Sequence, residues 1–121
     1  MIQLRTMLTP ADNSGAKRLM VIGMSAKIGK RATLAQVVNC VVDQADPAGI
    51  VADKEKVKVL VVRTKKEFGR RDGSYLRFDD NAGVVIDKQG LPRGTRILGP
   101  IAREVKEAGY TKIASLAREV V

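Results

Sequence analysis

Short apolar runs separated by turn-forming residues dominate the first two-thirds of the chain. The runs cover residues 19–22, 35–42, 57–62, 74–78 and 83–86, and Asp, Asn, Gly or Pro gather between them at residues 12–15, 46–49, 72–73, 79–81 and 89–92. Residues 75–78 alternate in the way of a half-buried strand. Short strands with regular turns predict a small barrel or a sandwich, and we favour a barrel because a small open sheet would expose its edges. The fold class is therefore predicted to be mainly β.

The apolar period changes near the C-terminus and predicts one or two short helices. The first is expected to have Pro100 in its first turn, where the missing N–H costs nothing, and to stop at Gly109. Its apolar residues share one face: Ile101, Val105 and Ala108. A second short helix is predicted from residues at i, i+3, i+4 and i+7: Ile113, Leu116, Ala117 and Val120. The 121 residues suit one domain, with the barrel at roughly 1–98 and the helical segment at roughly 99–121.

A basic hairpin is predicted around residues 63–77. The Asp72-Gly73 pair lies between two strand-like runs, and Gly readily takes the positive φ that a tight turn needs. Residues 63–71 contain five Lys and Arg but a single acid, Glu67. Because like charges repel at close range, packing does not explain this cluster, whereas a polyanionic partner would. We therefore expect a projecting two-stranded ribbon with a cationic tip.

The charge of the whole chain also indicates a polyanionic partner. Lys and Arg number 22 against 13 Asp and Glu, which gives a net charge of +9 spread along the sequence. Such a surface suggests nucleic acid or an anionic membrane as the partner. The alternative is a solvated basic surface with no partner.

Several residue types that support other functions are missing or rare. The chain has no His, so it lacks the residue that most often serves as a catalytic base or metal ligand. Its one Cys, Cys40, lies in an apolar run and is expected to be a small strand residue. A single thiol also fits a reducing compartment. The four aromatic residues offer few faces for stacking single-stranded bases. No apolar run reaches the ~20 residues of a membrane span, and no secretion signal is visible. We expect a soluble protein, intracellular or organellar, that reads the backbone and shape of a folded nucleic acid.

Three basic groups are candidates for phosphate contact, and Lys17-Arg18 adds a fourth short one. Arg can bind a phosphate through two parallel N–H bonds, while Lys acts as a point charge. The groups are the ribbon (Arg63, Lys65, Lys66, Arg70, Arg71 and Arg77), the loop with Lys27, Lys30 and Arg31, and the segment from Arg93 to Arg96. A solvated face is the alternative for each.

The adjacent Asp79 and Asp80 are the one hint of acid–base or metal chemistry. Without His or a third nearby acid they more often form a turn and offset the charge of the ribbon. Ser14 has no base to activate it. We predict no catalytic residue, no metal site and no cofactor, so the chain is not expected to be an enzyme.

Five segments carry a resemblance to a known family. They are residues 11–17 (Ala-Asp-Asn-Ser-Gly-Ala-Lys), 61–66 (Val-Val-Arg-Thr-Lys-Lys), 72–82 (Asp-Gly-Ser-Tyr-Leu-Arg-Phe-Asp-Asp-Asn-Ala), 94–104 (Gly-Thr-Arg-Ile-Leu-Gly-Pro-Ile-Ala-Arg-Glu) and 112–117 (Lys-Ile-Ala-Ser-Leu-Ala). In order and with near-identical spacing, they resemble the bacterial type of the family of large-subunit ribosomal protein fourteen. The resemblance covers the whole chain.

The resemblance implies a closed five-stranded barrel with a protruding ribbon and a C-terminal helical segment. It also implies a structural role in the large ribosomal subunit: binding to large-subunit rRNA, packing on neighbouring ribosomal proteins, and contact with small-subunit rRNA at inter-subunit bridges. A ribosome-silencing factor is expected to dock at the positions that match Thr95, Arg96 and Lys112. The expected place is the cytoplasmic ribosome, with an organellar ribosome left open. The expected rRNA-binding residues are Lys17, Arg18, Lys27, Lys30, Arg31, Arg63, Lys65, Lys66, Arg70, Arg71, Arg77, Arg93, Arg96 and Arg103.

The chain departs from this family pattern in three places. Ser25-Ala26-Lys27 replaces a Gly-Gly pair in a loop that is one residue shorter, and the acid-containing residues 52–55 replace a basic turn. Arg118 replaces a Pro, so the last helix is expected to run further.

Two rival functions remain to be tested. A free translation factor or RNA chaperone with an oligonucleotide-binding barrel would expose aromatic residues on its strands, and only Tyr75 and Phe78 are candidates. A hydrolase or nuclease would use Asp79 and Asp80 with a divalent metal, and metal-dependent cleavage of RNA would reveal it.

Overall fold

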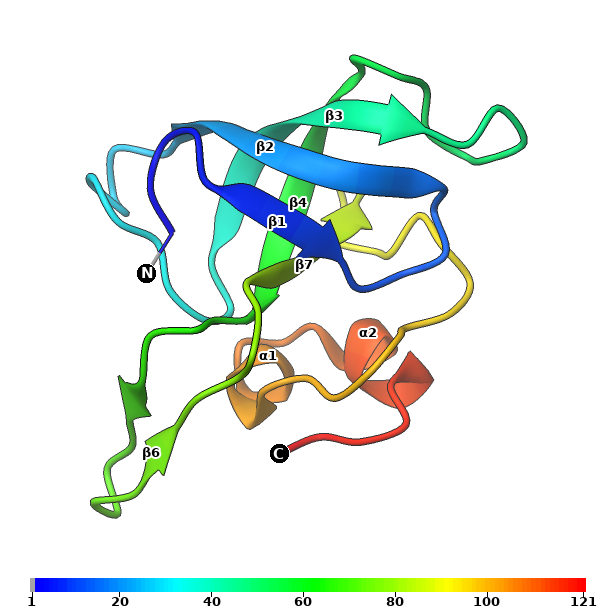
Figure 1. Cartoon of the computed structure of the whole chain (residues 1–121). Helices are drawn as coiled ribbons and strands as arrows, with labels where there is room; N and C mark the ends of the chain where they lie inside the picture. Colours follow the sequence, from blue (N-terminus) through cyan, green and yellow to red (C-terminus); the bar gives the residue numbers. More distant parts are fainter. Residues whose placement is uncertain (1) are drawn as a thin grey trace.

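Five strands close into a barrel in the computed structural model, which describes residues 2–121 (Figure 1). The strands are β1 (Met7–Pro10), β2 (Ala16–Met24), β3 (Val37–Ala45), β4 (Lys56–Arg63) and β7 (Ala82–Ile86). Neighbours pair antiparallel in the order β1-β2-β3-β4-β7, and a parallel pairing of β1 with β7 closes the ring. The predicted mainly β fold with a closed five-stranded barrel is confirmed.

The barrel interior is filled by alternate residues of its strands. On β3, Val38, Cys40 and Val42 are buried, while Asn39 between them is exposed, as the two-residue period of a strand requires. Burial raises the pKa of the Cys40 thiol to about 12, so Cys40 packs as a small apolar side chain, as predicted.

A second apolar cluster lies outside the barrel, between β4, β7 and the C-terminal segment. Leu60 and Val62 of β4 contribute to it, while Val59 and Val61 point into the barrel. A strand covered on both faces needs apolar residues on both, which explains the unbroken apolar run at residues 59–62. Ile101, Val105 and Ile113 cover this outer face.

Two short helices follow the barrel and lie beneath it in Figure 1: α1 (Arg103–Glu107) and α2 (Thr111–Leu116). The predicted stop of the first helix at Gly109 is confirmed, because Ala108 caps α1 and Gly109 has φ +100°. Its predicted start is wrong. Ala102 is still extended and donates its N–H to the Val62 carbonyl oxygen at 3.2 Å, so the chain runs beside β4 before it turns.

The expectation that the last helix runs past Arg118 is also wrong. Ala117 is extended, and residues 118–121 turn back towards the start of the segment. The Ile101 N–H donates to the Glu119 carbonyl, and the Val121 N–H donates to the Ile101 carbonyl. Val120 therefore lies in a bridge with Ile101 instead of on a helix face.

The predicted ribbon is present and projects from the barrel beside the helices (Figure 1). It consists of β5 (Phe68–Gly69) and β6 (Tyr75–Leu76), which pair antiparallel. Its second strand is shorter than the predicted 74–78. Among residues 2–121, no helix has the length and apolar character needed to cross a membrane.

Candidate nucleic-acid interface

The tip of the ribbon is a tight turn built by Asp72 and Gly73. Gly73 has φ +90°, and the Asp72 carboxylate accepts hydrogen bonds from the N–H and the hydroxyl of Ser74. The backbone of Arg70 closes the loop through bonds to Ser74 and Gly73. The Asp-Gly signal in the sequence therefore predicted the turn correctly, and the turn leaves Arg71 exposed beside it.

Arg63 is buried at the base of the ribbon and differs from the free cation that the sequence suggested. Its side chain is 10% exposed, and its Nε lies 3.1 Å from a carboxylate oxygen of Asp80. Nη1 donates to the carbonyl oxygens of Leu98 and Pro100, and Nη2 donates to Asp80. Within residues 2–121 the Nε–H has no hydrogen-bond partner, so its contact with Asp80 is an ion pair.

Asp80 therefore balances the charge of the ribbon, as the sequence indicated. Asp79, its neighbour, is exposed. Within residues 2–121, no group of three or more His, Cys, Asp or Glu side chains is placed to hold a metal ion.

Arg70 is the second ribbon cation that is paired with an acid of the protein itself. Its Nε and Nη2 donate to the two carboxylate oxygens of Glu104 on α1 at 3.2 and 2.9 Å. Nη2 also donates to the backbone oxygen of Val121 at 2.5 Å. The hydrogen bonds that Arg70 donates to Glu104 raise the pKa of Arg70. The ribbon is thus fastened to the C-terminal segment by a bidentate ion pair, the strongest form of such a pair.

The other ribbon cations are exposed: Lys65, Lys66, Arg71 and Arg77. Of these, Lys66 has an exposed ion pair with Glu67 at 2.9 Å, a kind of pair that is worth little in water. Arg103 of α1 lines a cleft together with Arg71 of the ribbon. This cleft brings two predicted phosphate-binding residues from distant parts of the sequence together.

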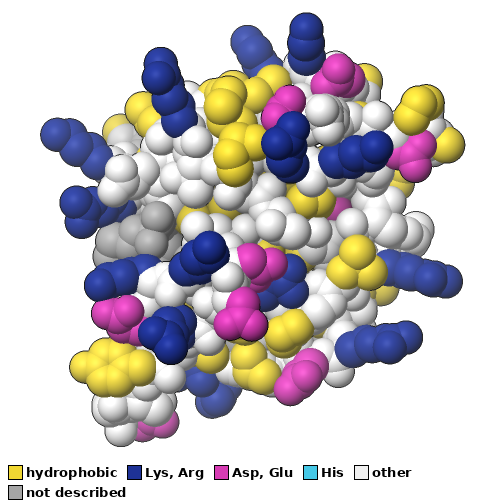
Figure 2. All heavy atoms as spheres, in the orientation of Figure 1, with side chains coloured by type: hydrophobic (Ala, Val, Ile, Leu, Met, Phe, Trp, Pro, Cys, Tyr) yellow, Lys and Arg dark blue, Asp and Glu magenta, His cyan; other side chains and the backbone are white. Residues whose placement is uncertain are grey.

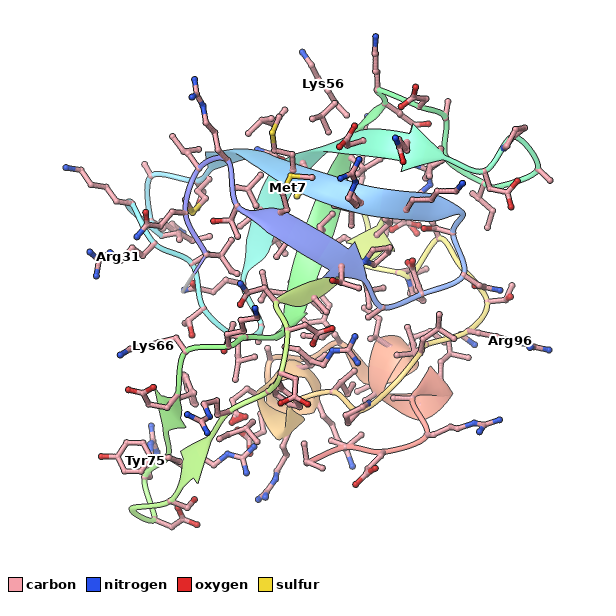
Figure 3. All side chains as sticks on the ribbon, in the orientation of Figure 1. Met7, Arg31, Lys56, Lys66, Tyr75 and Arg96 are labelled. Atoms are coloured by element: carbon pink, nitrogen blue, oxygen red, sulfur yellow. The ribbon has the colours of Figure 1, made fainter. Side chains whose placement is uncertain are left out.

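The loop between β2 and β3 carries the second basic group, and Lys27, Lys30 and Arg31 are all exposed there. Backbone bonds between Ile2 and Ala32 tie the end of this loop to the N-terminal segment. In Figure 3, Arg31 and Lys66 extend towards the same side of the molecule. The loop and the base of the ribbon therefore present exposed cations in one general direction.

In the third basic group, from Arg93 to Arg96, one arginine is paired with an acid and the other is exposed. Arg93 forms an ion pair with Glu55 at 2.7 Å, and this bond lowers the pKa of the Glu55 carboxyl. Arg96 is exposed and extends away from the barrel (Figure 3). The altered turn at residues 52–55 thus supplies an acid that holds Arg93 in place.

Asn13 holds the Gly94–Arg96 segment, and sequence reasoning had given it only a role in its own turn. Its side-chain oxygen accepts the N–H groups of Thr95 and Arg96 at 2.8 and 3.0 Å, and its amide donates to the Thr95 hydroxyl at 2.8 Å. A Cβ on Gly94 would come within 2.7 Å of that oxygen. The Asn13 and Gly-Thr-Arg motifs therefore form one structural unit.

Two predicted residues lie on β2, and one lies on α2. Lys17 and Arg18 are exposed, and Arg18 forms an exposed ion pair with Asp43. Lys112 is exposed on α2. Its neighbour Ile113 packs in the same cluster as Ile97, which follows Arg96. Thr95, Arg96 and Lys112 therefore flank one apolar cluster.

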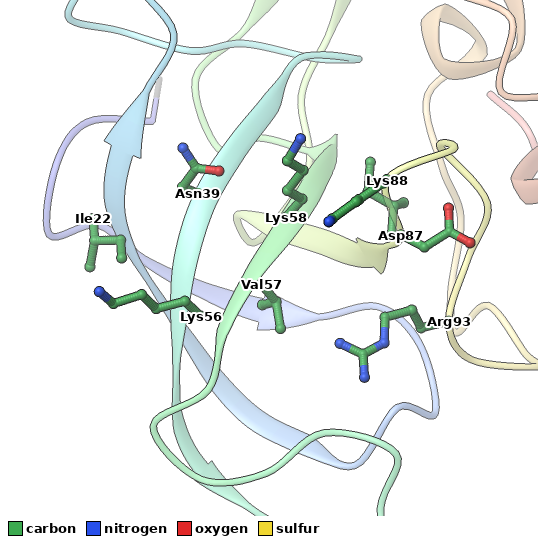
Figure 4. Close-up of a pocket in the computed structure, with 9 residues that line it drawn as sticks. Ile22, Asn39, Lys56, Val57, Lys58, Asp87, Lys88 and Arg93 are labelled. Atoms are coloured by element: carbon green, nitrogen blue, oxygen red, sulfur yellow. The ribbon is translucent and has the colours of Figure 1, made fainter.

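Sequence reasoning did not single out a further basic group on the barrel wall. Lys56 and Lys58 of β4, with Lys88 and Arg93 from the segment after β7, surround a shallow groove (Figure 4). The available signal was the alternation of Lys with buried Val at residues 56–59, which is typical of a strand with one charged face.

Lys and Arg side chains are spread over the face seen in Figure 2 and along its rim. Comparison with known proteins fits these observations. The family model described as ribosomal protein L14p/L23e matches residues 1–121. The large ribosomal subunit proteins uL14 of Aquifex aeolicus (strain VF5) and Aquifex pyrophilus are each 54% identical over 121 residues, with 100% of both chains covered. The uL14 protein of Petrotoga mobilis (strain DSM 10674 / SJ95) is 52% identical over 121 residues, with 99% of both chains covered.

Proposed function

Because the chain belongs to the ribosomal protein L14p/L23e family, we propose that it binds large-subunit rRNA through cations held on its barrel. It is a structural, non-enzymatic constituent of the large ribosomal subunit. Its place is the ribosome, which is cytoplasmic in bacteria. Family membership thus supports neither of the two rival functions, a free factor or a nuclease.

The observation that carries rRNA binding is the exposed set of cations on the β2–β3 loop and the ribbon. Lys27, Lys30 and Arg31 come from the loop, and Lys65, Lys66, Arg71 and Arg77 come from the ribbon. Lys66 has an acidic neighbour in its exposed pair with Glu67. Rows of exposed cations on a rigid support match the sugar–phosphate backbone of a folded RNA, which is recognised mainly by shape and charge.

Arg63 and Arg70 have a different role in this proposal. Their guanidinium groups are occupied by Asp80, Glu104 and backbone oxygens. They fix the ribbon against the C-terminal segment, and the free cations then meet RNA from a defined position. We assign to both a positioning role instead of direct phosphate contact.

Sedimentation of a tagged copy from cells tests the assignment. A structural constituent stays with the large subunit after a high-salt wash, while a free factor leaves it. A copy with Lys30→Gln, Lys66→Gln and Arg71→Gln should be washed off at lower salt than the unaltered copy. Equal retention of the two copies would contradict the contact proposed for these cations.

The second part of the proposal concerns the surface formed by Thr95, Arg96 and Lys112. Thr95 and Arg96 are exposed and held by Asn13, and Lys112 is exposed on α2 beside the same apolar cluster. We propose this surface for contact with small-subunit rRNA at a bridge and for docking of a ribosome-silencing factor.

Pull-down with a purified silencing factor tests the docking. Thr95→Ala and Lys112→Ala should weaken capture, while Lys17→Ala, also an exposed Lys but on β2, should leave it unchanged. Unchanged capture by both surface variants would exclude this surface as the docking site.

A further inference from the structure

The groove on the barrel wall has a charge that folding alone does not explain. Lys56 and Lys58 project from the outer face of β4, while Lys88 and Arg93 reach in from the segment after β7 (Figure 4). Val57 and Ile86 form part of its lining. Like charges brought together on one small surface repel each other, so this arrangement favours an anionic ligand.

The acids near the groove are already engaged. Asp87 is among the residues that line the groove, but its carboxylate accepts the N–H groups of Gln89 and Leu91 at 2.8 and 2.9 Å and points away from the lysines in Figure 4. Glu55 is bound to Arg93. Among residues 2–121, Lys56, Lys58 and Lys88 form no ion pair. Three ammonium groups therefore lack an ion-pair partner, and the four cations of the groove outnumber its one lining acid, Asp87.

The groove lies far from the ribbon. Lys56 begins β4, and Arg63 at the base of the ribbon ends it. Seven steps along a strand span about 23 Å at ~3.3 Å a residue. Figure 3 likewise places Lys56 and Tyr75, a ribbon residue, at opposite ends of the molecule. The same few phosphates cannot contact both groups.

We propose that this groove binds the sugar–phosphate backbone of a second RNA segment, separate from the one at the ribbon and the β2–β3 loop. The inference rests on the proposed rRNA binding and adds a site to it. Two features favour RNA as the occupant: the cations stand on both sides of the groove, and Lys recognises phosphate as a point charge without requiring a base sequence. None of the described residues that line the groove is aromatic, so contact with the backbone is favoured over base stacking.

Salt dependence of RNA binding tests the groove with three full-length variants of equal charge. The groove variant carries Lys56→Gln, Lys58→Gln and Lys88→Gln, and the loop–ribbon variant carries Lys30→Gln, Lys66→Gln and Arg71→Gln. The control carries Arg5→Gln, Lys106→Gln and Arg118→Gln, which alter exposed cations outside both sites. The probe is a short RNA duplex, and the readout is affinity by fluorescence anisotropy over a range of salt concentrations.

Loss of three phosphate contacts should lower the slope of log affinity against log salt by about two to three units in the groove variant, and by less than about one in the control. At low salt the unaltered chain should saturate with one more duplex than the groove variant. If the triple variant unfolds, as thermal melting would show, Lys88→Gln alone should lower the slope by about one unit.

The outcomes separate this inference from the proposed function. An unchanged slope and an unchanged number of bound duplexes in the groove variant, with a reduced slope in the loop–ribbon variant, would overturn the groove site alone. Unchanged slopes in both variants would overturn rRNA binding as well. Binding of an acidic peptide that is lost in the groove variant, while its RNA slope is unchanged, would make the groove a protein site and also overturn the inference.

Discussion

At the scale of single residues, Asn13 connects two distant parts of the sequence. Its amide side chain makes three hydrogen bonds to Thr95 and Arg96, although it also belongs to the turn that leads into β2. The exposed Arg96 side chain therefore extends from a segment whose backbone is fixed through the N–H groups of Thr95 and Arg96. Presentation of this surface depends on Asn13 as much as on the residues that form it.

Asn13→Ala is expected to lower the free energy of unfolding by about 1 kcal/mol, since its hydrogen bonds are exposed and each contributes modestly. It should also weaken silencing-factor capture. Asn13→Asp is the matched control, because it keeps the acceptor for both backbone N–H groups, and the Thr95 hydroxyl, which can rotate, can donate to the carboxylate in place of accepting from the amide. Urea unfolding and pull-down measure both effects. Equal losses in the two variants would show that the backbone bonds are unimportant.

The Glu55–Arg93 pair predicts a pH dependence. Arg93 holds the pKa of Glu55 below its ordinary value of 4.5. A carboxyl whose pKa is lowered by folding stabilises the protein above the unfolded pKa, and that contribution is lost as pH falls through the folded pKa. Both side chains are about a third exposed, so the contribution should be below about 1 kcal/mol.

Thermal melting of the unaltered chain and of Glu55→Gln measures this contribution. The melting temperatures should differ at about pH 6 and converge as the pH falls through the lowered pKa of Glu55, below which neither chain carries the charge. A constant difference across that range would show that the ion pair is not its source.

Sequence alone identified the basic run at residues 63–71 but not which of its cations are free. The partners of Arg63 and Arg70 are Asp80 and Glu104, which lie 17 and 34 residues away. Such pairing depends on the tertiary fold, so a buried Arg and an exposed Arg look alike in a basic run. The same limit applies to Lys56 and Lys58, whose convergence with Lys88 requires the barrel.

At the scale of elements, the ribbon and α1 behave as one unit because Arg70 and Glu104 join them. Both side chains of the pair are less than a fifth exposed. A two-stranded hairpin of this size is marginal in isolation. Its position therefore depends on this pair and on Arg63 at its base.

A double-mutant cycle with Arg70→Ala and Glu104→Ala is expected to give a coupling energy of about 1–2 kcal/mol, because the pair is bidentate and partly shielded from water. Arg71→Ala, which alters the exposed neighbour, should change the stability by less than about 0.5 kcal/mol. Urea unfolding provides the stabilities. Additive effects of the two single substitutions would show that the Arg70–Glu104 pair does not join the ribbon to α1.

The elements were predictable where the apolar pattern was strong. β4 and β7 are buried over long apolar runs, and the predicted boundaries differ from the observed ones by one residue at each end of β4. β1 was missed because it has four residues and ends in Pro10. Pro10 lacks the N–H that a strand interior normally uses, so tertiary closure of the barrel defines this strand more than local preference does.

At the scale of the whole molecule, the closed barrel is a rigid carrier for cations at several sites on its surface. It leaves no long open edge, because β1 and β7 pair to close the ring. Its net charge of +9 is distributed over loops, ribbon and wall instead of a flexible tail. Binding should therefore depend on the summed contribution of many phosphate contacts.

If six to ten phosphates are engaged, the affinity for folded rRNA fragments should fall by roughly 10³–10⁵ between low and moderate salt. Anisotropy titrations over that range measure the fall. The inactive control is the same titration with a neutral polymer in place of RNA. A nearly salt-independent affinity would mean that phosphate contacts do not dominate.

Crosslinking of protein to RNA in intact large subunits, followed by mass spectrometry of the crosslinked peptides, tests the central claim most directly. We expect crosslinks from the β2–β3 loop with Arg31 and from the exposed ribbon cations Lys66 and Arg71, and none from the buried Arg63. Recovery of the protein in large subunits without any crosslink from these segments, or its absence from the subunits, would contradict the account.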